Sequence, residues 1–197
     1  MTQTDLANVA LGHLGSSVIM AITENSAAAE HCRRFWDITR DALLRQRHWN
    51  FAIKRADLSE LDDAPLFGWT KAYQLPADYI LAIEFNGRQA GTGEALHEIE
   101  GSHLLTNEVT AELKYIRRHE DVSGWDASFC EAFGYFLAAR IAPAMTSAQG
   151  VADTLLSRGE QFMLRAFGPD NLESRPRAVL AQTGSAWLAA REGANNW

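Results

Sequence analysis

A regular amphipathic pattern over residues 27–48 constrains the fold of this chain more than any other feature. The apolar side chains recur at helical i, i+3, i+4 spacing: Ala28, Cys32, Phe35, Trp36, Thr39, Ala42 and Leu43. Ser26, directly before the pattern, is a typical N-cap residue. The pattern therefore predicts a helix with one buried face. On its surface we expect three i,i+4 ion pairs: Glu30–Arg34, Arg33–Asp37 and Asp41–Arg45.

The hydrophobic period changes at Trp49, where aromatic and apolar residues begin to alternate with polar ones. Trp49, Phe51 and Ile53 alternate as in a half-buried strand, and a β-rich region follows to about residue 119. Strand-like stretches in that region are GWTKAYQL, YILAIEF and TAELKYIRR. Asn86-Gly87 predicts a type I′ turn, and Glu100-Gly101 is expected at the tip of a second hairpin.

Helical spacing also occurs before and after this β-rich region. A first helix is expected over residues 4–14, and a later one begins near Ser123 or Asp126 and ends or kinks at Pro143. A further helix is expected from about Ser147 until Gly168-Pro169 stops it. Because both lie on apolar stripes, Trp36 and Phe133 should meet in one core.

These elements predict an α+β fold: an antiparallel helical bundle with an inserted β-hairpin or sheet region and an extended C-terminal tail. We assign residues 1–48 and 120–167 to the bundle, 49–119 to the inserted β-rich region and 168–197 to the tail. The tail has weak periodicity and scattered glycine, serine and asparagine, so we place it outside the core.

Composition excludes several classes of protein. The formal net charge is −7, from 25 acidic and 18 basic residues, whereas a protein that binds DNA tightly usually presents a basic surface. The stretch RDALLRQRHWNFAIKRADL, residues 40–58, interleaves arginines with aromatics and could hold nucleic acid, but the arginines have acidic neighbours at helical spacing. No apolar run reaches the roughly 20 residues that cross a bilayer, and the N-terminus lacks a secretion signal.

We find no motif that predicts an enzyme. Cys32 and Cys130 lie in helical patterns and are interpreted as small core residues, as expected for a chain made in a reducing cytoplasm. The cluster HEIEGSH could bind zinc, but a turn at Glu100-Gly101 places His97 and His103 on opposite faces of the hairpin and pairs Glu98 with His103. We therefore expect no catalytic residues, no metal and no cofactor.

Several stretches together resemble one family, the head-to-tail adaptors of short-tailed phages, also called the tail tubular protein A family. The stretches, in order, are RDALLRQRHWNFAIKRADL, FGWTKAYQLPADYI, EIEGSHLLTN, LKYIRR and FCEAFGYFLAARIAPAMT. The resemblance covers residues 5–167. It departs from the family at Tyr79, where many members have cysteine, and after Gly168, where no family motif is found.

The resemblance implies a structural virion protein, located in the tail or neck, that forms a ring of twelve copies. Its expected partners are the portal protein, the tail nozzle protein and further copies of itself, with DNA passing through the channel without sequence-specific binding. The alternatives are a small phage-encoded hydrolase and a DNA-binding packaging factor.

The tail contains the residue types that are most enriched at binding hot spots. We therefore expect the following residues to bind the portal or a neighbouring subunit: Arg175, Arg177, Trp187 and Trp197. The alternative is a tail that folds back on its own helices.

Overall fold

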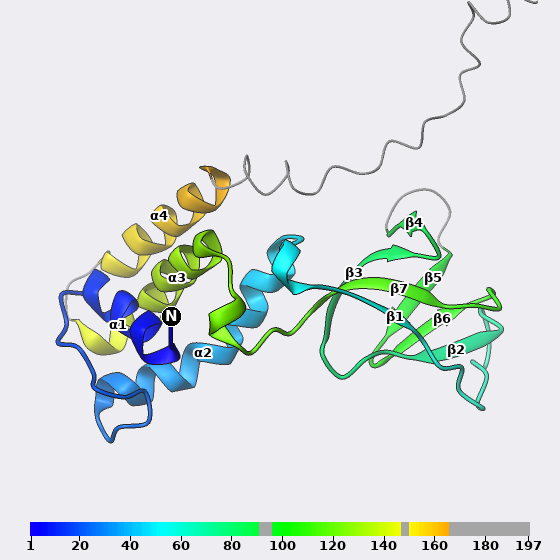
Figure 1. The fold of residues 1–197 in the computed structure, drawn as a ribbon, viewed down its shortest axis with the longest axis horizontal. Coiled ribbons are helices and arrows are strands. Elements are labelled where there is room, and N and C mark those ends of the chain that lie inside the picture. The colour runs from blue at the N-terminus through cyan, green and yellow to red at the C-terminus, as the bar shows by residue number, and fades with distance from the viewer. Residues whose placement is uncertain (91–95, 147–149, 166–197) are drawn as a thin grey trace, which may run out of the picture. The chain divides into compact units, whose positions relative to one another are not determined.

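The computed structural model describes residues 1–90, 96–146 and 150–165. It shows a mixed α+β fold, with four helices and two antiparallel sheets in the described residues (Figure 1). Residues 1–166 form one compact unit. The predicted tail, residues 168–197, and the predicted stop at Gly168-Pro169 lie outside the described residues.

Local capping signals set the starts of the first three helices. The bounds of the four described helices are α1 Gln3–His13, α2 Ala27–Gln46, α3 Ala127–Met145 and α4 Val151–Arg165. Thr2 and Asp5 form a capping box on α1, and the side chain of Asp126 caps α3. The Ser26 side chain accepts a hydrogen bond from the Ala29 N–H, which confirms the predicted N-cap of α2.

Helix α3 is the central helix, because α1, α2 and α4 all pack against it (Figure 1). Its apolar residues are buried almost all round, as expected for a helix enclosed by others. The predicted contact between Trp36 of α2 and Phe133 of α3 is confirmed, with ring centroids 4.7 Å apart. Cys32 and Cys130 are free and buried, as predicted.

Of the two alternatives predicted for Pro143, an end of the helix or a kink, the end was wrong, because α3 continues to Met145. Proline removes one N–H from the helical ladder. Only two residues of α3 follow Pro143, and the Thr146 N–H still bonds to the Ala142 carbonyl at 2.9 Å. A single lost hydrogen bond in the last turn is therefore tolerated.

The prediction of a strand from Trp49 was also wrong at its start. Residues Asn50–Ala52 form a 3-10 turn, and the strand begins only at Ile53. Trp49 is buried, its indole N–H donates to the Leu43 carbonyl at 3.1 Å, and its ring meets Phe129 edge-on at 5.0 Å. The aromatic side chain thus packs into the helical core instead of onto a sheet.

The strands form two antiparallel sheets that face each other across a small core of their own. One sheet has the order β1-β7-β3-β4 and the other β2-β6-β5. The strand bounds are β1 Ile53–Asp57, β2 Lys71–Gln74, β3 Tyr79–Phe85, β4 Arg88–Gln89, β5 His97–Glu100, β6 His103–Thr106 and β7 Glu112–Arg117. The core between the sheets contains Tyr73, Leu75, Phe85, Leu104, Ala111, Leu113 and Tyr115.

The first predicted turn is confirmed and the second is displaced. Asn86 and Gly87 both have positive φ, 47° and 76°, as a type I′ turn between β3 and β4 requires. In the second hairpin Glu100 pairs with His103, so the loop is Gly101-Ser102 and not Glu100-Gly101. Gly101 has φ 58°, which fits the first position of this loop and draws the turn forward by one residue.

Candidate docking surfaces

The HEIEGSH cluster does not form a metal site in the described hairpin. His97 faces inward and its ring lies 4.8 Å from that of Phe85, whereas His103 lies beside Glu100 on the outer face. The prediction of opposite faces is confirmed, but the predicted pairing of Glu98 with His103 was wrong because of the displaced turn. Among the described residues, no three histidine, cysteine or carboxylate side chains lie close enough to hold a metal ion.

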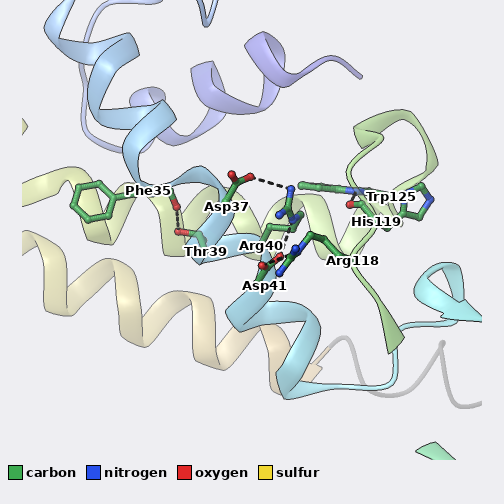
Figure 2. Close-up of polar contacts among 8 residues, drawn as sticks. All are labelled: Phe35, Asp37, Thr39, Arg40, Asp41, Arg118, His119 and Trp125. Atoms are coloured by element: carbon green, nitrogen blue, oxygen red, sulfur yellow. Dashed lines mark hydrogen bonds and ion pairs between the residues drawn. The ribbon is translucent and has the colours of Figure 1, made fainter. Parts of the chain in front are cut away.

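Arg40, the first residue of the arginine-rich stretch, is buried and bonded within the fold. Its guanidinium contacts Asp37 at 3.0 Å and Asp41 at 2.8 Å, and its side chain is only 5% exposed (Figure 2). The second oxygen of Asp41 accepts a hydrogen bond from Arg118 at 2.9 Å. Asp41 thus links α2 to the segment that follows β7.

The next two cations of the stretch join separate elements. Arg45 donates to the Ile80 carbonyl of β3 at 2.9 Å, and Arg47 donates to the Met163 carbonyl of α4 at 3.0 Å. The stretch is therefore a structural corner where helices and sheet meet, and the guanidinium groups of Arg40, Arg45 and Arg47 are engaged by protein atoms.

Two of the three predicted ion pairs on α2 were wrong for the same reason. Only Glu30–Arg34 forms, at 2.6 Å. Arg33 instead donates to the carbonyls of Ile22 and Glu24, and Arg45 reaches β3. Backbone carbonyls from other elements compete successfully with the i,i+4 carboxylates.

Lys54, next on β1, belongs to a second bonded group that includes Asp78 and Tyr115. The Lys54 ammonium lies 2.9 Å from one oxygen of Asp78, and the Tyr115 hydroxyl donates to the other at 2.8 Å. Burial opposes ionisation of Asp78, but the hydrogen bonds from Lys54 and Tyr115 outweigh it and lower its pKa. Burial and the bond to Asp78 raise the pKa of Tyr115. This group also holds the fold together.

The first exposed apolar surface lies between α1 and α2, where Val18 and Met20 are 70% and 89% exposed. Ile19 between them is buried, and its backbone N–H and carbonyl both bond to the Asn8 side chain, at 2.8 and 3.0 Å. The Ile22 N–H donates to the Thr4 hydroxyl at 3.2 Å. The backbone of this loop is therefore fixed to α1, with the Val18 and Met20 side chains exposed on it.

The second exposed apolar surface lies in the loop between β1 and β2. Leu66 and Phe67 are 97% and 87% exposed. Pro65 precedes them, and Gly68 follows with φ 82°, a conformation that favours glycine. Neighbouring large apolar side chains exposed to this degree are typical of binding sites.

We did not predict either of these surfaces as a site from the sequence. Apolar residues within a proline- and glycine-bounded loop, as in PLFG, are the available signal. The residues that we did predict lie outside the described part of the chain: Arg175, Arg177, Trp187 and Trp197.

In comparisons with known proteins, no protein-family model matches this chain and no curated protein matches it. None of the described helices is both long enough and apolar enough to span a membrane.

Proposed function

We propose that this chain is a structural virion protein of a short-tailed phage, a head-to-tail adaptor and not an enzyme. Twelve copies form a ring that joins the portal protein to the tail nozzle protein and leaves a channel for DNA. The proposed architecture is an antiparallel helical bundle with an inserted sheet region and an extended C-terminal tail. The protein is made in the host cytoplasm, acts in the tail or neck of the virion and uses no cofactor.

The observation that carries this proposal is the presence of two separate apolar surfaces in one small chain. Val18 and Met20 lie among the helices, and Leu66 and Phe67 lie beside the sheets. An adaptor needs at least two interfaces, and exposed apolar pairs are suited to become the buried centres of such interfaces.

The charge distribution favours a channel through which DNA passes and does not favour a surface that binds DNA tightly. Arg40, Arg45, Arg47 and Lys54 are engaged by carboxylates and carbonyls, and Trp49 is too buried to stack on a base. With a net charge of −7, copies arranged around a channel favour weak contact with phosphates.

Native mass measurement and electron microscopy of the purified chain, with and without the portal protein of the same phage, test the proposal. We expect a monomer or weak oligomer alone and twelve-subunit rings on the portal. Failure to bind the portal contradicts the proposal. Tight duplex binding with a steep salt dependence favours the packaging factor, and polymer hydrolysis that single Asp or His substitutions abolish favours the enzyme.

Serine variants assign the two surfaces to their partners. We expect Met20→Ser and Phe67→Ser each to weaken binding to one partner, portal or nozzle, and to leave the other unchanged. Leu164→Ser on α4, which is 69% exposed, is the matched control. If neither variant affects either partner, these surfaces do not carry the adaptor function.

A further inference from the structure

A groove lies between the loop that contains Leu66 and Phe67 and the outer face of the β2-β6-β5 sheet. Its volume is about 760 Å³. The strand register shows which side chains of the sheet form the floor of this groove. Ala72, Leu105 and Glu98 lie side by side in one row across the three strands. The next row on this face consists of Gln74, His103 and Glu100.

The floor of the groove is apolar in the middle and acidic along β5. Side chains alternate between the faces of a sheet, so Tyr73, Leu104 and Ile99 belong to the inner face and pack in the core between the sheets. Leu105 is left on the outer face, with the carboxylates of Glu98 and Glu100 beside it on the edge strand.

The loop supplies an aromatic wall. Trp69 is half-buried, and its indole N–H donates to the Glu98 carboxylate at 3.0 Å, which fixes the ring against the sheet. Leu66 and Phe67 line the same groove and are almost fully exposed. Leu105 is only 7% exposed and forms the base of the groove, so the apolar surface open to a ligand side chain comes mainly from the Phe67 and Trp69 rings.

The charge around the groove has one sign. Four carboxylates line it: Asp62, Asp63, Glu98 and Glu100. Among the described residues that line the groove, none is lysine or arginine. A ligand with positive charge on either side of an apolar group therefore complements it, whereas an acidic or purely apolar ligand does not.

We propose that this groove binds a cationic polypeptide segment of a partner protein, with one large apolar side chain against Phe67, Trp69 and Leu105. Lysine or arginine residues beside that side chain face the four carboxylates. The inference rests on the groove alone and does not require the adaptor function.

Fluorescence anisotropy with a short labelled peptide, a central leucine between pairs of lysines, tests this on the purified full chain. We expect binding that weakens as salt is raised. Replacing the lysines by glutamates, or the leucine by serine, should weaken binding at least about tenfold. No binding of the lysine peptide, or equal binding of the glutamate peptide, overturns the proposal.

Variants of the chain localise the binding. Phe67→Ser and Glu100→Lys should each weaken the lysine peptide at least about tenfold. Val109→Ser is the matched control, because Val109 is 77% exposed on the same part of the chain and does not line the groove. Unchanged melting temperatures show that the variants fold. Equal affinity of Phe67→Ser and the parent chain overturns the proposal.

A further possible outcome of these experiments is that a second copy of this chain occupies the groove. If light scattering shows that the parent chain dimerises and that Phe67→Ser abolishes the dimer, a second copy occupies the groove. That result also overturns the proposed partner.

Discussion

Arg40 illustrates why a basic residue need not be a ligand-binding residue. Its side chain is 5% exposed, and it bonds to Asp37, which is 78% exposed, and to Asp41, which is 26% exposed. A buried cation is tolerated only when its hydrogen bonds are satisfied. Arg40 therefore bonds to Asp41 within α2, and Asp41 in turn bonds to Arg118 in the segment that follows β7.

Replacing Arg40 by methionine keeps most of the buried stem but removes the charge-assisted hydrogen bonds. We expect Arg40→Met to lower the free energy of unfolding by about 1–3 kcal/mol, because Asp41 keeps only Arg118 as a partner. Arg34→Met is the control on the same helix. Its ion pair with Glu30 is well exposed, so the loss should be within about 0.5 kcal/mol. Urea unfolding measures both, and equal losses would contradict the structural role of Arg40.

His13 should make the stability of the protein depend on pH. Its ring stacks on Tyr135 with centroids 4.2 Å apart, and among the described residues its Nε2 atom has no hydrogen-bond partner. Burial lowers the pKa of His13 below its ordinary value of 6.5; the Glu131 carboxylate opposes this shift and Arg158 adds to it. Between the two pKa values the unfolded chain binds a proton that the folded chain does not.

The contribution of His13 to the free energy of unfolding is therefore fully present above about pH 6.5. It declines as the pH falls toward the lower pKa that His13 has in the folded protein. We expect the melting temperature to fall between about pH 7.5 and pH 5.5, before most carboxylates titrate. His13→Gln should reduce this fall. It should not abolish it, because burial also lowers the pKa values of His97 and His119. A melting temperature that rises on acidification would contradict this sign.

At the scale of single elements, helices and turns that depend on neighbouring residues were predicted correctly more often than those that depend on distant contacts. Helix α2 was predictable because its N-cap, Ser26, and its apolar stripe are both local in the sequence. The 3-10 turn at Asn50–Ala52 could not be predicted in this way, because Trp49 packs against Phe129, which is distant in the sequence. The displaced second hairpin differs, because its signal is local: Gly101, with φ 58°, takes the first position of the two-residue loop.

The candidate docking surfaces were harder to predict than the fold. Leucine and phenylalanine side chains occur in cores and at interfaces alike, so PLFG does not by itself reveal that Leu66 and Phe67 are exposed. In the arginine-rich stretch the predicted partner of Arg45 was Asp41, whereas Arg45 and Arg47 donate to carbonyls of distant elements, which local spacing does not reveal.

Replacing two glycines by alanine should change the free energy of unfolding in opposite directions, because one lies in a helix and the other in a turn. Gly12 lies in α1 in open space, so Gly12→Ala should raise the free energy of unfolding by about 0.5–1 kcal/mol. Gly87 has φ 76° in the β3–β4 turn, so Gly87→Ala should lower it by about 1 kcal/mol. Thermal unfolding of the two variants measures both effects. Equal shifts of the same sign would contradict the assigned turn.

At the scale of the whole molecule, the two apolar surfaces belong to different parts of the fold. The loop with Val18 and Met20 is tied to α1, and the loop with Leu66 and Phe67 borders the β2-β6-β5 sheet. Under the adaptor proposal, the predicted tail adds a third contact. Its contribution can be separated from theirs by truncation.

Deleting residues 169–197 should abolish docking without destabilising the rest of the chain. The weak periodicity of the tail predicts that it lies outside the core, so we expect the melting temperature to be unchanged. Docking should fail because the deletion removes the predicted partner-binding residues: Arg175, Arg177, Trp187 and Trp197. Co-sedimentation with portal-containing particles measures docking, and the full chain with Arg191→Ala serves as a control for loss of charge alone. A truncated chain that assembles normally would show that the tail is not the docking element, and a lowered melting temperature would show that it folds back on its own helices.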